Sequence, residues 1–325
     1  MERSTRPRCP LLSSLMDRQG FTATLRIGVA IRIAGLLTLV VLALTTPGVT
    51  ANASLLSFIN TSALVGCVAV GMTFITLSGN IMSFSLGATI GATAVTFAAV
   101  SDYGVGPAFL VAISIAISLN VIQGLVIGVF RANPIIVSIA ALALIGGIAE
   151  LWTENRIIYS AEGSLTILKG KFAGIPIAGI VFVICAGLAH AVLRYTQFGQ
   201  NILMVGSNFR AATAAGVKIW RTIAAAYGWA GFFAGISGIL IVARYDAGHM
   251  EYGAGYDYSA IGSVLVGGTA IQGGQGSVIR TMFGVMVITG TSMILLLRGL
   301  ETEYQQLFTG LIILAAVLLQ GRLRP

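Results

Sequence analysis

The feature that most constrains this chain is a long stretch without charge: residues 33–101 contain no Asp, Glu, Lys or Arg. Over the whole chain 56% of the residues are hydrophobic and 9% are charged, whereas a soluble domain carries about 25% charged residues. No water-soluble fold could bury so much apolar surface. The composition therefore predicts an integral membrane protein in contact with the lipid bilayer, and it excludes disordered, fibrous and disulfide-scaffold proteins.

Ten apolar stretches are long enough to cross a bilayer, since a helical span needs about 20 mostly apolar residues. We expect an all-α membrane protein whose membrane domain, residues 27–320, lies between an N-terminal tail, 1–26, and a C-terminal tail, 321–325. The first stretch is interpreted as a signal anchor. The expected spans are 27–44, 55–77, 82–100, 107–130, 134–151, 174–193, 223–243, 258–278, 279–298 and 304–320.

The placement of charge tests this count of spans. With both termini in the cytoplasm, most of the 19 lysines and arginines fall in cytoplasmic segments, and most of the 11 acidic residues fall outside or at the outer rim. Lys and Arg concentrate on the cytoplasmic side of membrane proteins. Residues 194–222 are then the longest cytoplasmic loop, and 152–173 form an external loop. The net charge of +8 therefore reflects topology, and no nucleic-acid partner is expected.

Ten spans divide into five and five, and an odd number of spans in each half would make the two halves inverted repeats. The third span of each half, 82–100 and 258–278, is rich in glycine. Glycine-interrupted segments at matching positions in two halves indicate the central site of a transporter. We therefore predict two inverted five-helix halves with a solute path between these two segments.

A polar solute needs neutral hydrogen-bonding partners along this path, and exposed backbone is tolerated in a membrane only where it lines a cavity. An alternative is that the small polar residues of these segments only pack helices together. The candidate path residues are Ser83, Ser85 and Gly87 on the first segment, Asn120 and Gln123 on the following span, and Ser259, Gly262 and Ser263 on the second segment.

Patterns that carry enzyme chemistry are absent from the sequence. His190 and His249 form no HExxH motif, the three cysteines form no CxxC, and Gly170-Lys171 lacks the other residues of a phosphate-binding loop. We expect no metal site, no cofactor and no catalytic activity in this chain. No acidic or basic residue is expected at the centre of a span either, although such residues mark proton or sodium coupling.

The cytoplasmic loop 194–222 is the most informative segment. Asn208 can cap a short helix from Phe209 to Ala215, and Gly216 can end that helix in a left-handed conformation. The resulting helix is basic and rich in alanine, so it could sit in a groove of a partner protein. The alternative is that the loop is a simple connector.

At this loop the sequence resembles a known family. FGQN…GSNFRAATAAGV (198–217) is similar to the FGR…GGN…AA…GI loop of ABC importer permeases of the ribose/monosaccharide class. Residues 267–284 resemble the family's GGTS…GGxGSVxGTxxG, 68–81 resemble the stretch before its GGIDLSVGS, and 133–137 resemble its xPxFIVTL. The resemblance covers residues 55–320 and keeps the four motifs in the family's order.

The resemblance implies a membrane-spanning subunit of an importer in the bacterial inner membrane. Such permeases work in pairs, with an ATP-binding cassette subunit that binds ATP inside and a periplasmic solute-binding protein outside. The solute would be a monosaccharide or a similar small polar molecule. The residues implied in coupling to the ATP-binding subunit are Asn208, Arg210, Ala211, Ala212 and Gly216.

One departure widens the range of solutes. Met82 stands where the family's GGIDLS carries its Asp, so a different sugar, a polyol or a nucleoside also fits the pattern. A secondary transporter with five-plus-five inverted repeats is the alternative function, although it would call for an ionisable group within the membrane. A membrane enzyme is a second alternative, and it is disfavoured by the missing catalytic cluster.

Overall fold

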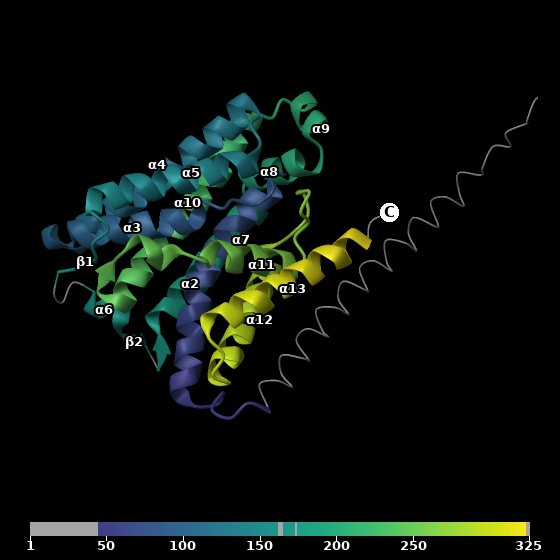
Figure 1. Cartoon of the computed structure of the whole chain (residues 1–325). Coiled ribbons are helices and arrows are strands. Elements are labelled where there is room, and N and C mark those ends of the chain that lie inside the picture. Colours follow the sequence, from purple (N-terminus) through teal and green to yellow (C-terminus); the bar gives the residue numbers. More distant parts are fainter. Residues whose placement is uncertain (1–44, 162–164, 173, 323–325) are drawn as a thin grey trace, which may run out of the picture.

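The computed structural model describes residues 45–161, 165–172 and 174–322, which are folded almost entirely into helices (Figure 1). The expected N-terminal tail and first span, 1–26 and 27–44, lie outside the described residues. The longer helices are α2 (Asn52–Leu77), α4 (Val105–Phe130), α5 (Pro134–Thr153), α7 (Ile177–Tyr195), α10 (Ile219–Tyr245), α12 (Val278–Leu297) and α13 (Thr302–Arg322).

The helices differ in whether they are long and apolar enough to span a membrane, and shorter elements connect them. Among the described residues, 6 helices are long and apolar enough to cross a membrane, namely α2, α4, α5, α7, α10 and α12. The apolar part of α13, Glu303–Leu318, is shorter. The remaining helices are α3 (Leu86–Val100), α6 (Thr166–Lys169), α8 (Gln197–Ser207), α9 (Phe209–Ala214) and α11 (Tyr256–Val266), with the 3-10 turns η1 (Ser101–Tyr103) and η2 (Met250–Gly253).

The two glycine-rich segments are broken, as their sequence indicates. α3 begins only at Leu86, after a non-helical stretch, and α11 ends at Val266, before another non-helical stretch that reaches Ser277. Gly79 has a φ of +82° and Gly268 a φ of +81°, a left-handed conformation that glycine adopts without steric cost. Neither expected span, 82–100 or 258–278, is therefore one continuous helix.

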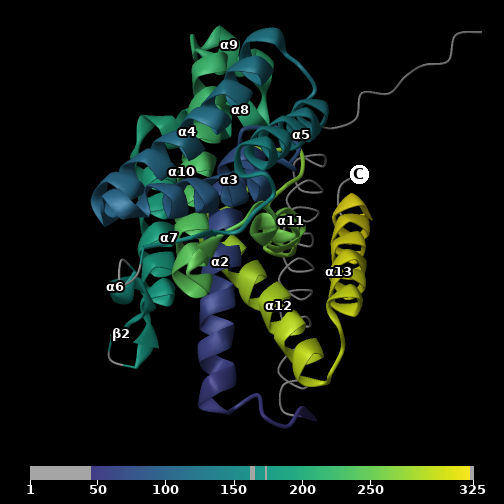
Figure 2. The same cartoon turned by 60° about the vertical axis from the view of Figure 1, so that its left-hand side comes forward.

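The core lies where α2 and α10 pack together, and α2 also packs between α7 and α12 (Figure 2). A Cβ atom on Gly71 of α2 would lie 3.0 Å from the Ala230 carbonyl oxygen of α10, so the two backbones nearly touch. Beside this contact the Phe74 ring stacks on Trp229, with ring centroids 6.0 Å apart, and on Phe198, at 6.3 Å.

The long helix of each half packs on helices of the other half. α10 contacts α3 and α4, whereas α2 contacts α11 and α12. Two side-chain pairs join α2 to α12: Ser62 and Thr289 share a hydrogen bond of 2.8 Å, as do Thr73 and Thr281. This reciprocal packing ties the N-terminal and C-terminal halves of the chain into one bundle.

Glycine pairs allow α4 and α10 to approach closely. A Cβ atom on Gly128 of α4 would lie 2.9 Å from the Trp220 Cα atom, and one on Gly231 of α10 would lie 2.9 Å from the Asn120 Cβ atom. Small residues four positions apart permit such helix contacts in membranes. The GxxxG pairs of these helices therefore serve packing within the chain.

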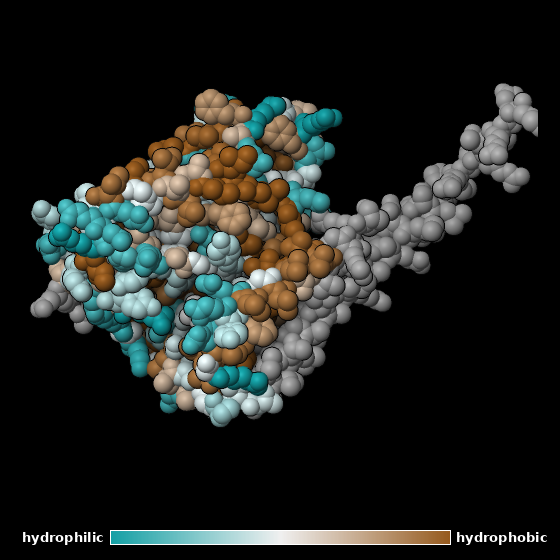
Figure 3. All heavy atoms as spheres, in the orientation of Figure 1, coloured by the Kyte–Doolittle hydropathy of each residue, from teal (hydrophilic) through white to brown (hydrophobic). Residues whose placement is uncertain are grey.

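Apolar side chains cover the outside of the bundle. Figure 3 shows hydrophobic side chains over α4 and α5, with hydrophilic side chains gathered toward β1 and α9. An apolar surface of this kind matches contact with lipid chains. The most exposed large apolar residues of α4, α5, α7 and α13 include Leu110, Ile136, Leu144, Ile148, Leu151, Ile184, Leu307 and Leu311.

Short strands fasten the loop between α5 and α7. β1 (Ile158–Tyr159) pairs antiparallel with β4 (Ala247–Gly248), and β2 (Lys171–Phe172) pairs with β3 (Ile175–Pro176). The β1–β4 pair brings this loop to the end of α10.

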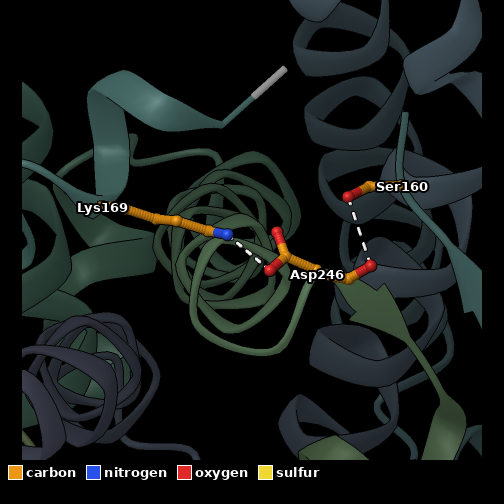
Figure 4. A network of polar contacts seen from close by, with 3 residues as sticks. All are labelled: Ser160, Lys169 and Asp246. Atoms are coloured by element: carbon orange, nitrogen blue, oxygen red, sulfur yellow. Dashed lines mark hydrogen bonds and ion pairs between the residues drawn. The ribbon is translucent and has the colours of Figure 1, made fainter. Parts of the chain in front are cut away.

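Asp246 holds the same loop at a second point (Figure 4). It ends α10 with a φ of +56°, and its carboxylate accepts a hydrogen bond from the Lys169 ammonium group. Its carbonyl oxygen accepts a hydrogen bond from the Ser160 nitrogen, at 2.9 Å, and another from the Ser160 hydroxyl, at 3.3 Å. The residues of the expected external loop are thus anchored to one end of α10.

Candidate functional site

The short helix expected in the loop 194–222 is present as α9. The Asn208 side chain accepts a hydrogen bond from the Ala211 nitrogen at 3.0 Å, which is the predicted cap. Gly216 follows with a φ of +79°, which is the predicted left-handed end. The helix stops at Ala214, one residue before the expected limit.

Four of the five candidate coupling residues are exposed. Asn208, Arg210, Ala211 and Gly216 are open to the surroundings, whereas Ala212 is fully buried. Ala212 therefore anchors α9 on the bundle, and its neighbours on the helix form the surface that a partner could contact.

Arg131 links α9 to the end of α4. It follows the last residue of α4 in a left-handed conformation, with a φ of +52°, and its guanidinium carbon lies 5.3 Å from the centre of the Phe209 ring. A cation placed over an aromatic ring is attracted by its electrons. No sequence motif indicated this pair.

The candidate path residues of the first half lie together. Ser83 and Ser85 share a hydrogen bond of 2.9 Å, and the Ser85 hydroxyl donates to the Gln123 side-chain oxygen at 2.8 Å. Nearby, the Asn120 amide nitrogen donates to the Thr89 hydroxyl at 3.1 Å. All five side chains are buried between α3 and α4, and we call them the amide–hydroxyl cluster.

Two atoms of this cluster have unmet hydrogen-bonding capacity. Among the residues that the structure describes, neither the Gln123 side-chain nitrogen nor the Asn120 side-chain oxygen has a hydrogen-bond partner. Buried polar atoms are nearly always paired, with protein or with water, because an unpaired one costs free energy. These two atoms could therefore bind a water molecule or a hydroxyl group of a solute.

The candidate residues of the second half lie elsewhere. A Cβ atom on Gly262 would lie 3.1 Å from the Ile313 side chain of α13, so this glycine lies in the packed interface between α11 and α13. The Ser263 hydroxyl donates to the Ser259 carbonyl oxygen at 2.7 Å, within α11 itself. The structure thus does not bring Gly262 and Ser263 to the amide–hydroxyl cluster, because both pack against α12, and Gly262 also against α13.

The first turn of α11 carries a buried acidic residue, although the charge pattern predicts most acidic residues outside or at the outer rim. Asp257 is only 6% exposed, and its carboxylate accepts a hydrogen bond from the Gly87 nitrogen at 2.5 Å. The Phe84 and Tyr258 rings meet beside it, with centroids 6.3 Å apart. α3 and α11 therefore begin at the same place inside the bundle.

The segment that leads to Asp257 is also more deeply packed than an external loop. A Cβ atom on Gly248 would lie 2.6 Å from the Ala94 carbonyl carbon, and one on Gly253 would lie 2.9 Å from the Gly91 nitrogen. The chain between them therefore runs along α3 toward its N-terminus. A glycine or alanine at five of the nine positions 247–255 was the available sequence signal for such close packing.

Two hollows flank these features. One, of about 440 Å³, lies between α3, α5 and residues 250–257, and its lining includes Gly87, Glu150 and Asp257. The other, of about 360 Å³, lies between residues 78–81, the end of α4 and the α8–α9 region. Its lining includes Asn80, Gly206, Arg131, Phe209 and Gln272.

Comparison with known proteins identifies the family. Residues 54–317 match the family described as branched-chain amino acid transport system / permease component. The chain belongs to this permease family. It is therefore a multi-pass membrane protein and a transport subunit, and the matched range contains both hollows, α9 and the amide–hydroxyl cluster.

Curated relatives of the permease cover most of its length. It is 30% identical over 274 residues to the ribose import permease protein RbsC of Bacillus subtilis, a match that covers 83% of this chain and 85% of the relative. It is 29% identical to the probable ABC transporter permease protein YphD of Escherichia coli, over 86% of this chain and 84% of the relative.

A third relative is the autoinducer 2 import system permease protein LsrD of Yersinia pestis, which is 28% identical over 78% of both chains. No solved structure matches the permease significantly. In the described part of the permease, no group of three or more His, Cys, Asp or Glu side chains could hold a metal ion.

Proposed function

We propose that this permease is the membrane-spanning subunit of an ATP-driven importer for a monosaccharide or a similar small polar solute. The observation that carries the proposal is the identity of 30% to a ribose import permease over 83% of this chain. The name of a third relative, an autoinducer 2 import permease, adds a second small solute that related permeases import.

The proposed topology has ten spans in the bacterial inner membrane, with both termini in the cytoplasm. The reciprocal packing of α2 on α11 and α12, and of α10 on α3 and α4, supports two inverted five-helix halves. In this orientation α9 lies on the cytoplasmic side, and the loop anchored at Asp246 lies on the periplasmic side.

Three partners follow from this topology. An ATP-binding cassette subunit would dock on the exposed surface of α9 formed by Asn208, Arg210, Ala211 and Gly216, and it would bind the ATP, so the permease itself needs no cofactor. A periplasmic solute-binding protein would dock at the opposite end. A second permease subunit, identical or related, would complete the pair.

We propose that the solute passes beside the start of α3. Gly87 borders the hollow of about 440 Å³, and the amide–hydroxyl cluster lies directly behind this turn. The unpaired atoms of Asn120 and Gln123 offer one acceptor and one donor, which suits the hydroxyl groups of a sugar. These two amide groups are neutral, and the carboxyl groups of Glu150 and Asp257 in the lining of the hollow offer further acceptors for hydroxyl groups.

The test is purification of the tagged permease from its native membranes in mild detergent. The proposal expects an ATP-binding protein to co-purify, and it expects the solute-binding protein loaded with ribose or a related sugar to stimulate ATP hydrolysis. A permease that purifies without any ATP-binding subunit from membranes where it is active would contradict the proposal.

A further inference from the structure

Three backbone segments from distant parts of the sequence meet at one point beside α8. They are the end of α2 with Gly79, the end of α8 with Gly206, and Gly274 in the loop between α11 and α12. The Gly274 nitrogen donates a hydrogen bond to the Leu77 carbonyl oxygen at 3.0 Å. We call this meeting point the glycine junction.

The contacts at the glycine junction leave no room for side chains. A Cβ atom on Gly206 would overlap the Leu77 carbonyl oxygen and would lie 2.5 Å from the Gly274 nitrogen. One on Gly274 would lie 2.7 Å from the Ser207 Cα atom. A side chain can absorb a small displacement by changing rotamer, whereas directly packed backbones have to move together.

Each segment of the junction leads to a feature of the candidate site. Gly206 lies two residues before Asn208, which caps α9. Gly79 begins the broken stretch that continues into Ser83 and Ser85 of the amide–hydroxyl cluster. Gly274 belongs to the broken stretch that follows α11. The junction therefore connects the α9 surface to both broken segments within a few residues.

The surroundings of the junction leave space for movement. Gly79 and Gly206 line the hollow of about 360 Å³, and Arg131 and Phe209 line it as well. The contact between the Arg131 guanidinium group and the Phe209 ring fixes α9 to the end of α4. α9 is thus held at two places, by α4 through this contact and by the glycine junction. A displacement of α9 would therefore change the backbone contacts at the glycine junction.

We propose that Gly206 is a positioning residue that transmits movement of α9 to the two broken segments, through its direct backbone contacts with residues 77–79 and Gly274. The inference rests on the proposed function, because it assumes that an ATP-binding subunit moves α9. It adds the residue and the contact by which that movement reaches the start of α3.

The test compares Gly206→Ala with the matched control Gly187→Ala in the complete transporter. Gly187 lies on α7, and an added Cβ atom there would meet nothing within 4 Å. For each variant we would measure its amount in the membrane, co-purification of the ATP-binding subunit, ATP hydrolysis and uptake of labelled sugar. The added methyl group at Gly206 is expected to separate the packed backbones, as overpacking does in a close-packed interior.

The proposal expects Gly206→Ala to uncouple the transporter. Membrane amount, co-purification and ATP hydrolysis stay near the level of the control, while uptake falls by about tenfold or more. Normal uptake in Gly206→Ala would overturn the proposal while leaving the proposed function intact. Absence of ATP-dependent uptake in the unmodified transporter would instead count against the proposed function itself.

A distance measurement gives a second readout that packing alone would not alter. In a variant without Cys9, Cys67 and Cys185, spin labels at Ile81→Cys and Thr213→Cys report the separation between the first broken segment and α9; both sites are exposed. With the junction intact, both segments move together, so the label at Ile81 should shift against a third label at Gly187→Cys when ATP is added.

With Gly206→Ala added, the label at Ile81 should no longer follow the nucleotide state. The same ATP-dependent shift with and without Gly206→Ala would overturn the proposal. If Gly206→Ala does not reach the membrane, Gly79→Ala replaces it, since its added Cβ atom would lie 3.1 Å from the Gly206 Cα atom. Failure of both variants to insert would contradict the proposal, because it would assign the junction to folding and not to transmission.

Discussion

The Gly87 nitrogen and the Asp257 carboxylate lie 2.5 Å apart in a hydrogen bond that joins the first turns of α3 and α11. Ser85, the residue before α3, makes no side-chain cap, so Asp257 supplies the missing acceptor from the other half of the chain. A carboxylate near a helix N-terminus is stabilised by the helix dipole. Asp257 lies at the N-termini of both α3 and α11. The two helix dipoles explain why a buried acid is tolerated there.

Replacing Asp257 should therefore destabilise the bundle. In Asp257→Ala the buried Gly87 nitrogen loses its acceptor, and a buried donor left unpaired costs about 1–3 kcal/mol. Asp257→Asn keeps an acceptor and should lose less. The measurement is the midpoint of thermal unfolding in detergent, with Asp102→Ala, an exposed acid, as the control. Equal midpoints for Asp257→Ala and Asp102→Ala would show that this contact does not stabilise the fold.

Adjacent alanines on α9 should behave differently when each is replaced by glutamate. Ala211 is exposed, so Ala211→Glu should leave the permease in the membrane but weaken co-purification of the ATP-binding subunit. Ala212 is fully buried, and an unpaired buried charge costs several kcal/mol, so Ala212→Glu should lower the amount of folded permease. Immunoblots of membranes and of purified complexes measure both effects. Similar results for the two variants would refute the proposed docking surface.

Thiol labelling can test the solute path. In a variant that lacks Cys9, Cys67 and Cys185, Gln123→Cys and Ser85→Cys should react with a small water-soluble thiol reagent in at least one nucleotide state of the transporter. Ser263→Cys should stay unreactive, because the Ser263 backbone packs against Gly284 of α12, away from the hollow of about 440 Å³ beside Gly87. Protection of the first two cysteines by the transported sugar would strengthen the assignment. If neither reacts in any nucleotide state, the path lies elsewhere.

Reporter fusions can test the proposed topology. A fusion at Gly170, in the loop that contacts Asp246, should report the periplasm, and a fusion at Asn208 should report the cytoplasm. The physical basis is the concentration of lysine and arginine on one side of the membrane. Activity of both fusions in the same compartment would exclude the ten-span arrangement.

The sequence predicted features that depend on local chemistry. Asn208 and Gly216 have side-chain and backbone properties that determine where a short helix begins and ends, and the structure confirms both ends of α9 to within one residue. The breaks before Leu86 and after Val266 follow in the same way from glycines that adopt left-handed conformations. Hydropathy alone located the long helices.

The sequence could not predict contacts between distant segments. The sequence pattern predicts Asp257 at the membrane surface. The residue is buried because α11 starts beside α3, a contact between distant parts of the chain. Gly262 and Ser263 carry the right chemistry for a path, but the direction of α11 turns them toward α12 and α13. The glycine junction likewise exists only because residues 77–79, 206–207 and 273–274 meet in space.

The most direct test of the central claim is uptake of labelled ribose by vesicles that contain the complete transporter and the solute-binding protein. The account predicts uptake that requires hydrolysable ATP, persists when proton and sodium gradients are collapsed, and stops when a non-hydrolysable ATP analogue replaces ATP. The same uptake assay with labelled polyols, nucleosides and other sugars then defines which solutes are transported. Uptake of any of these solutes that follows an ion gradient and proceeds without ATP would contradict the account.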